Sequence, residues 1–198
     1  MASNSNLKFM SFNCFGVKNK LPIIRDLCNQ TDILFLQETW LLPHDLGILN
    51  SVHPSFVSYS TSAVNVDDGI LTGRPFGGLS ILWNKCSSMR IKVVNFDDVR
   101  MSGIILELNG SPYLCINVYL PYYCAENIDE YYMYMGKLSS IVEECDASGI
   151  IVLGDFNADV GKLFYRELER VYARTTRYPS WTQSSYLIIR SLTSITAH

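Results

Sequence analysis

The sequence lacks the features that mark several specialised classes of protein. Its 198 residues contain no apolar run approaching the roughly 20 residues that a membrane-spanning helix needs. It has no block of like charges and no low-complexity segment, and only 18% of its residues are charged. These absences argue against a membrane span and against a disordered tail. A hydrophobic content of 48% predicts one globular domain with a substantial core.

The six cysteines have no spacing that is typical of a zinc site or a redox motif. They include no CxxC pair and no Cys/His cluster, and they stand at positions 14, 28, 86, 115, 124 and 145. We therefore expect buried free thiols in a reducing compartment. The first residues, MASNSNLKFMSF, also lack the basic and apolar regions of a secretory signal. The sequence thus predicts a soluble intracellular protein, nuclear or cytoplasmic, that does not bind membranes.

The net charge of −3 is unevenly distributed along the chain. Residues 162–198 hold six Lys or Arg and two Glu, so the first 161 residues carry a net charge of −7. Tight non-specific binding of nucleic acid depends on cationic contacts to phosphates, which an acidic body does not favour. An acidic body does suit a site that concentrates a divalent cation.

Short apolar runs alternate with longer amphipathic segments along the chain. Continuous apolar runs are typical of strands that are covered on both faces, and Asn109-Gly110 predicts a hairpin. The pattern predicts strands at 7–13, 33–38, 77–83, 90–96, on both sides of the hairpin turn and at 150–157. It predicts helices at 21–30, at 127–145 with Asn127 as N-cap, and at 163–172. We expect an α/β fold in which two packed sheets have helices outside.

Polar residues follow or end four of the expected strands. They are Asn13, Glu38, Tyr119, and the pair Asp155 and Asn157. Sheets fix the positions of groups at strand ends while loops leave those ends open, so binding and catalytic groups often lie there. Carboxylate and amide oxygens suit Mg²⁺ or Mn²⁺, which could activate a water for attack on phosphorus.

Each position taken alone has a more ordinary explanation. A single Asp or Asn after a strand is usually a turn residue or a helix cap. Asn13, followed by Cys-Phe-Gly, fits a plain turn, and Tyr119 fits a core aromatic. The pattern alone leaves both explanations open: a metal-dependent hydrolase, or a set of unrelated structural residues.

Four short motifs occur in a characteristic order: FNCFG (12–16), LQET (36–39), INVYLP (116–121) and GDFNAD (154–159). In that order and context they resemble the exonuclease–endonuclease–phosphatase superfamily. Together with TGRPFGGLSILW (72–83), they are most similar to the apurinic-type endonuclease domains of LINE-class (non-LTR) retrotransposons. The resemblance covers roughly residues 7–170 and implies a four-layer α/β sandwich, two mixed and largely antiparallel sheets packed face to face and flanked by helices.

The resemblance also implies roles for the polar residues. Glu38 would hold Mg²⁺ or Mn²⁺, with Asp155 as a further ligand that orients or deprotonates the attacking water. Asn157 and Asn13 would bind the scissile phosphate, and Tyr119 would donate a hydrogen bond to it. The implied substrate is a DNA phosphodiester.

The GRPFGG loop (73–78) would lie near this substrate. Its Arg74 would then be available for a phosphate contact. An arginine beside Pro and two glycines in an exposed loop is equally consistent with a solvated side chain. Both readings of Arg74 stay open.

Two further elements of the resembled family have no match in this chain. One is an Asp in a strand that follows a Ser/Thr-Trp segment, and Ile189 stands at or within one residue of its place. The other is a Ser-Asp-His, which no part of the sequence up to His198 contains. We therefore expect the fold to lack its last strand or strands, with 171–198 as a degenerate or truncated C-terminal part of the domain formed by 1–170.

These observations lead to one main functional hypothesis and two alternatives. The main one is a divalent-metal-dependent phosphodiester hydrolase of the DNA endonuclease type, derived from a retrotransposon and impaired by the missing elements. The first alternative is a catalytically inactive remnant that at most binds nucleic acid or a partner. The second is a phosphatase acting on lipid or inositol phosphates, from which GRPFGG and VYLPYY (118–123) point away.

Overall fold

The computed structural model describes residues 7–64, 73, 75–87, 89–158 and 188–191. Two sheets form the centre of the molecule. The first has four strands in the order β1-β2-β4-β3, and the second has five in the order β5-β6-β7-β8-β9. Within them only β1 with β2 and β7 with β8 pair in parallel. The expected pair of mixed, largely antiparallel sheets is therefore confirmed.

The strands of the first sheet are β1 (Phe9–Asn13), β2 (Ile33–Gln37), β3 (Phe56–Thr61) and β4 (Leu79–Asn84). Those of the second are β5 (Arg90–Val94), β6 (Met101–Leu108), β7 (Ser111–Tyr119), β8 (Gly149–Asp155) and β9 (Ile188–Ser191). The helices are α1 (Leu21–Cys28) and α2 (Ile128–Glu144), with three 3-10 segments, η1 (Val17–Asn19), η2 (Pro43–Ser51) and η3 (Ala125–Asn127).

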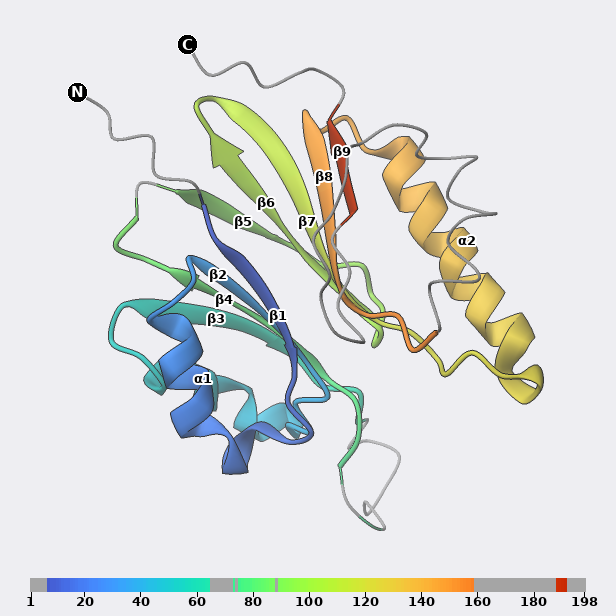
Figure 1. Ribbon diagram of the computed structural model, residues 1–198, viewed down its shortest axis with the longest axis horizontal. Helices are drawn as coiled ribbons and strands as arrows, with labels where there is room; N and C mark the ends of the chain where they lie inside the picture. The colour runs from blue at the N-terminus through green and yellow to red at the C-terminus, as the bar shows by residue number, and fades with distance from the viewer. Residues whose placement is uncertain (1–6, 65–72, 74, 88, 159–187, 192–198) are drawn as a thin grey trace.

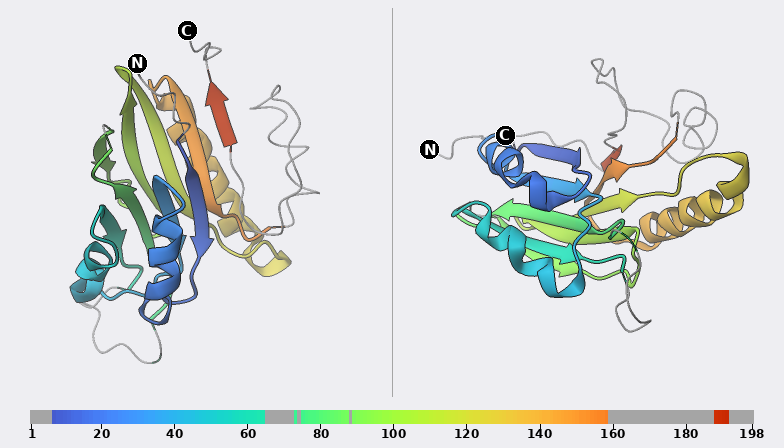
Figure 2. Two further views of the ribbon diagram at one scale, coloured as in Figure 1. Left: turned by 60° about the vertical axis from the view of Figure 1, so that its left-hand side comes forward. Right: turned by 90° about the horizontal axis from the view of Figure 1, so that it is seen from below.

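The helices α1 and α2 lie on opposite outer sides of the two sheets (Figure 1). Figure 2 shows the same arrangement from two other directions. Side chains alternate across each buried strand, which explains the continuous apolar runs. In β2, Ile33 and Phe35 pack between the sheets, whereas Leu34 and Leu36 pack on the side that carries α1. The described part of the chain thus has the expected layers.

Most of the expected elements are present, with small shifts at their ends. Asn109 and Gly110 both have positive φ (50° and 80°), as the two central residues of a tight hairpin turn require. The sequence analysis missed β3, because FVSYST carries small polar residues instead of an apolar run. Asn127 stands at the expected N-cap position of α2, but its side chain makes no capping hydrogen bond. The helix expected at 163–172 lies outside the described residues.

None of the helices that the structure describes is long and apolar enough to span a membrane. The six cysteines are all free. Three of them, Cys14, Cys28 and Cys115, are buried as expected, but Cys86 is exposed.

Strands β7 and β8 leave no room for a side chain one residue before Asp155. Gly154 pairs with Val118 of β7 and has a φ of 148°. A Cβ atom at Gly154 would overlap the backbone oxygen and nitrogen of Val118. Only glycine therefore lets β8 lie against β7 at the end that carries Asp155.

Substituting this glycine should destabilise the fold much more than substituting an unconstrained one. Gly154→Ala is expected to lower the free energy of unfolding by about 3 kcal/mol or more, because the new methyl group meets backbone. Gly136→Ala is the matched control, since Gly136 is exposed on α2 and a Cβ there meets nothing within 4 Å. That control should gain about 0.5–1 kcal/mol. Urea unfolding of both variants checks this, and equal midpoints would contradict it.

Candidate active site

The five polar residues expected to converge come from both sheets. Parallel strands present their carboxyl ends at the same edge, and the two parallel pairs are β1 with β2 and β7 with β8. Asn13 ends β1, Glu38 directly follows β2, and Tyr119 and Asp155 end β7 and β8. Because β1 and β8 are also in contact where the sheets meet, these ends come together at one place.

The amide of Asn13 links the two carboxylates. Its Nδ2 donates one hydrogen bond to Glu38 Oε1 and one to Asp155 Oδ2, each at 2.8 Å. The two carboxylates therefore lie within reach of one small group, although Asn13 and Asp155 are 142 residues apart in the sequence. The amide oxygen of Asn13 faces its own loop and accepts the Phe15 N–H at 3.3 Å.

The two carboxylates have no cationic partner among the described residues. Glu38 is 9% exposed and Asp155 is 6% exposed, and no described Lys, Arg or His forms an ion pair with either. Two nearly buried negative charges side by side are unfavourable unless a cation compensates them. The pair therefore fits a divalent cation, and Mg²⁺ in particular is bound through one or two carboxylates and completes its shell with water and substrate oxygens.

No three His, Cys, Asp or Glu residues within the described ranges form a group that could hold a metal. A closed structural site such as those of zinc is therefore not formed by these residues. The two carboxylates fit the open type of site instead, in which the substrate supplies part of the coordination.

Tyr119 contributes a phenol that stays protonated. Burial raises the pKa of this phenol to about 12, and the Glu38 charge, a side-chain hydrogen bond with Glu38, and the Asp155 charge raise it too. A hydrogen bond with Asn157 acts in the opposite direction. At neutral pH Tyr119 is therefore a hydrogen-bond donor, and its proton points toward Glu38.

A short turn after β8 places Asn157 beside Asp155. The Asn157 N–H donates to Asp155 Oδ1 at 2.9 Å, and its Nδ2 donates to the Leu120 carbonyl at 2.8 Å. Asn157 has a φ of 47°, a left-handed conformation that asparagine tolerates better than most residues. The turn thus carries a carboxylate and an amide to the same edge while its backbone groups bond to the chain after β7.

Glu38 is held in an unusual backbone conformation. Its φ is 53°, which is strained for a residue with a long side chain. Its carbonyl accepts the Gly16 N–H at 2.8 Å, and the buried Cys14 thiol donates to the Gln37 carbonyl at 3.0 Å. Burial raises the pKa of this thiol to about 12, so it remains a donor. A strained residue that is fixed so closely, and whose carboxylate shares the Asn13 amide with a second carboxylate, indicates a functional position.

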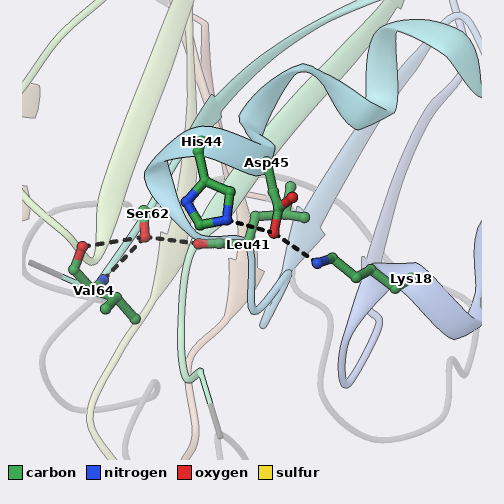
Figure 3. Close-up of polar contacts among 6 residues, drawn as sticks. All are labelled: Lys18, Leu41, His44, Asp45, Ser62 and Val64. Atoms are coloured by element: carbon green, nitrogen blue, oxygen red, sulfur yellow. Dashed lines mark hydrogen bonds and ion pairs between the residues drawn. The ribbon is translucent and has the colours of Figure 1, made fainter. Parts of the chain in front are cut away.

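Polar contacts anchor the segment after Glu38 (Figure 3). Ser62 donates to the Leu41 carbonyl at 2.7 Å and accepts the Val64 N–H at 3.1 Å. Asp45 of η2 pairs with Lys18 of η1 at 2.6 Å, and the hydrogen bond from Lys18 lowers the pKa of Asp45. These contacts tie the loops after β1 and β2 to each other and to the end of β3.

A buried pair of amides lies between the sheets beneath the site. Gln37 Nε2 donates to Asn117 Oδ1 at 2.7 Å, and Asn117 Nδ2 donates to the Leu36 and Ser80 carbonyls at 3.0 and 3.1 Å. Gln37 Oε1 accepts the Ser11 hydroxyl at 3.2 Å. The sequence analysis missed these residues, although a polar side chain inside each of two apolar runs was the available signal.

The five expected residues Asn13, Glu38, Tyr119, Asp155 and Asn157 are thus brought together, whereas Arg74 lies outside the described residues. The described histidines lie elsewhere. His44 pairs with Asp45 (Figure 3), and His53 hydrogen-bonds to Asn29. Sequence reasoning also missed the wall beside Tyr119, where Arg100 lies over the Tyr119 ring at 5.9 Å.

Comparison with protein families gives one match that spans most of the chain. Residues 10–189 match the model of the Endonuclease/Exonuclease/phosphatase family. A comparison with curated proteins finds no match.

Solved structures with the same fold share little sequence with this chain. The humanised TDP2 of Danio rerio has a TM-score of 0.62 and 17% identity over 97% of this chain and 85% of its own. The human Nocturnin catalytic domain, solved with a bound sulfate anion, has a TM-score of 0.59 and 16% identity, with 91% and 80% coverage. A mannosyl-6-phosphatase of Bacteroides thetaiotaomicron has a TM-score of 0.56 and 17% identity, with 81% and 68% coverage.

The protonated state of Tyr119 can be tested by optical titration. A tyrosine with an ordinary pKa near 10 is half ionised at pH 10, whereas a pKa of about 12 leaves Tyr119 protonated there. At pH 10 the wild-type protein and Tyr119→Phe should therefore show equal tyrosinate absorbance. A wild-type excess equal to half a tyrosine would contradict the raised pKa.

The buried amides should contribute substantially to stability. Asn117→Ala leaves the Gln37 amide buried without its acceptor, and we expect the free energy of unfolding to fall by at least about 2 kcal/mol. The control is Asn95→Ala, whose exposed side chain donates a hydrogen bond to Asp97. Its effect should stay within about 0.5 kcal/mol. Similar urea midpoints for the two variants would show that the amide pair does not stabilise the sheets.

Proposed function

The chain belongs to the endonuclease/exonuclease/phosphatase family, and on that premise we propose that it is a divalent-metal-dependent phosphodiester hydrolase of the DNA endonuclease type. The observation that carries this proposal is the Asn13 amide, which holds the Glu38 and Asp155 carboxylates together at 2.8 Å from one nitrogen. That pair is nearly buried and lacks a cationic partner among the described residues.

We assign the metal to Glu38 and Asp155 because these are the uncompensated carboxylates of the site. A bound Mg²⁺ or Mn²⁺ would polarise a phosphate oxygen and stabilise the charge that develops on it. Asp155 orients the attacking water and accepts its proton, since the Asn13 and Asn157 hydrogen bonds fix both of its oxygens in place. Water then attacks phosphorus opposite the leaving oxygen, and the bond from phosphorus to that oxygen breaks as the oxygen takes up a proton from solvent.

The remaining residues bind the phosphate. Asn157 and Asn13 supply amide donors, and Asn157 releases its Leu120 carbonyl when a phosphate oxygen replaces it. Tyr119 keeps its proton at neutral pH and turns it from Glu38 to a non-bridging oxygen. A phenol that is protonated at the working pH suits this role better than an ionised one.

We propose that the chain hydrolyses phosphodiesters slowly. The resemblance implies a histidine on the scissile phosphate, and neither histidine of the described residues lies at the site. Loss of one member of a group that acts as a unit often lowers the rate by about 10³-fold. We further propose, from the four ordered motifs and the GRPFGG segment, that the chain descends from the endonuclease of a LINE-class retrotransposon. We also propose that residues 1–170 and 171–198 are parts of one domain. The antiparallel pairing of β9 with β8 supports that last point.

Nicking of supercoiled plasmid by the purified chain tests the activity. We expect slow nicking that needs Mg²⁺ or Mn²⁺ and stops in EDTA. Glu38→Ala and Asp155→Ala should each abolish it, a loss of about 10³-fold or more. Glu143→Ala is the matched control, because Glu143 is an exposed acidic residue on α2 and should nick like the wild type.

Each outcome separates the main proposal from its alternative. Nicking by the chain that survives both active-site substitutions would contradict the roles assigned to Glu38 and Asp155. Metal binding by a folded chain without any nicking would favour the alternative, an inactive relative that at most binds nucleic acid or a partner. Circular dichroism of every variant confirms that the compared proteins are folded.

A further inference from the structure

The carboxylate of Glu38 reaches the candidate active site because the chain turns at this residue. Side chains alternate along β2, so Gln37 points between the sheets to Asn117, whereas Leu36 packs on the side that carries α1. An extended Glu38 would continue the alternation and point to the side of Leu36. Its φ of 53° breaks the alternation, so that its carboxylate meets Asn13, which also bonds to the second sheet. The position of this carboxylate therefore depends on what holds residue 38 in a left-handed conformation.

The loop after β1 holds one side of this turn. The Gly16 N–H donates to the Glu38 carbonyl at 2.8 Å. The Val17 N–H donates to the Thr39 carbonyl at 3.1 Å. A Cβ atom at Gly16 would lie 2.7 Å from the Trp40 ring, closer than Cβ atoms approach other groups in proteins. The loop therefore lies this close to residues 38–40 only because Gly16 has no side chain.

A pair of glycines before β4 holds the other side. The Thr39 N–H donates to the Gly78 carbonyl at 3.2 Å. The Trp40 N–H donates to the Gly77 carbonyl at 2.9 Å. Trp40 is left-handed as well, with a φ of 54°, so a strained residue stands on each side of Thr39. Such conformations persist only where surrounding contacts enforce them, and here four backbone hydrogen bonds to two loops do so.

Gly78 leaves just enough room for Thr39. A Cβ atom at Gly78 would lie 2.5 Å from Thr39 Oγ1 and 3.1 Å from the Thr61 carbonyl oxygen. Thr39 is 1% exposed, so its side chain cannot turn out to solvent. Its hydroxyl has no hydrogen-bond partner among the described residues. A side chain at position 78 must therefore displace Thr39, which directly follows Glu38.

We propose that Gly78 is a positioning residue for Glu38, because its missing side chain keeps Thr39, and with it the strained turn, in place. The inference rests on the proposed function for the metal that Glu38 would hold. A methyl group at position 78 displaces Thr39, and the Glu38 carboxylate moves relative to Asn13. The metal site then loses affinity although neither of its carboxylates has been changed.

The side-chain amide of Asn13 reports the position of Glu38 without any metal. Its two N–H groups give ¹H–¹⁵N signals, which Asn13→Ala identifies by their loss. Both carboxylates accept from this amide, so its signals depend on where the carboxylates lie. In the metal-free protein, Gly78→Ala should shift these signals by more than their line width. A substitution that only weakens the fold elsewhere would leave them in place.

Binding of Mn²⁺ measures the consequence for the site. The probe is Mn²⁺ alone, and the paramagnetic resonance signal of the free ion gives the bound fraction. Gly78→Ala should weaken binding by about 10- to 100-fold, the usual cost of disturbing a group that orients a metal ligand. Adding Thr39→Ala to Gly78→Ala should recover most of the affinity, because it removes the Oγ1 that the new methyl group meets. Thr39→Ala alone should bind like the wild type.

Gly110→Ala is the matched control, because it separates the overlap from the backbone strain. Gly110 has a φ of 80°, close to the 82° of Gly78, but a Cβ atom there meets nothing within 4 Å. Both substitutions place alanine in a left-handed conformation, and only Gly78→Ala adds an overlap. Gly110→Ala should lower the urea midpoint but leave the Asn13 signals and the Mn²⁺ affinity unchanged.

Three results would overturn the proposal. One is a folded Gly78→Ala variant whose Asn13 signals match those of the wild type. Another is an equal loss of Mn²⁺ affinity in Gly110→Ala. The third is a double variant that binds Mn²⁺ no better than Gly78→Ala. If Gly78→Ala does not fold, Gly16→Ala takes its place, since its methyl group meets a ring that can move. Unchanged Asn13 signals in that variant would overturn the proposal as well.

Failure of the proposed function gives a different result. A wild-type chain that binds no Mn²⁺ would contradict the metal assignment, while the Asn13 signals would still decide whether Gly78 positions Glu38. Wild-type Mn²⁺ binding together with unshifted Asn13 signals in Gly78→Ala would contradict only the positioning role.

Discussion

The buried hydrogen bonds that join Asn117 to Gln37, Leu36 and Ser80 fix the position of one sheet relative to the other. Apolar packing alone would allow two sheets to slide, because it has no direction. A buried amide allows no such freedom, since each donor left unpaired costs free energy. Asn117 uses both of its amide protons and its oxygen, and it bonds to β2 and β4 from β7. The candidate site depends on this constraint because its side chains come from both sheets.

The two parallel strand pairs place the side chains of the candidate site at one edge of the aligned sheets. Each pair brings two carboxyl ends to the same edge, and the sheets then bring the two pairs together. The Asn13 side-chain nitrogen donates hydrogen bonds to Glu38, which follows a strand of the first sheet, and to Asp155, which ends a strand of the second. Strain at Glu38 and the glycine contact before Asp155 show how closely the backbone is fitted there. The same edge continues into a cleft lined by Phe76, Tyr119 and Tyr122, so that the cleft and the candidate site share the Tyr119 side chain.

The sequence predicts the strands best where both faces are buried. The continuous apolar runs of β2 and β8 predicted buried strands, and Asn109-Gly110 predicted the hairpin between β6 and β7. The sequence did not predict β3, whose strand carries serine and tyrosine. It placed Asn127 correctly before α2 but did not predict that the side chain makes no capping hydrogen bond. In such cases tertiary contacts decide the structure, and local preference does not.

Much of the candidate site could be named from strand ends, because a polar group after an apolar run stands out in a sequence. Contacts between distant segments could not be named in this way. Nothing in the sequence indicates that one amide bonds two carboxylates, or that Phe76, Asn127 and Tyr122 surround one cleft. Those facts depend on the packing of the two sheets, which no local pattern encodes.

The hydrogen bonds within the site compete with any bound phosphate for the same donor groups. Tyr119 donates to Glu38, Asn13 donates to both carboxylates, and Asn157 donates to Leu120. These three side chains therefore already donate hydrogen bonds within the protein in the resting state. Under the proposed function, an incoming phosphate would exchange these bonds for its own and gain only the difference, so a cation that neutralises Glu38 and Asp155 would have to arrive first or together with it. Metal and substrate affinities would then be coupled, each raising the other by the same factor.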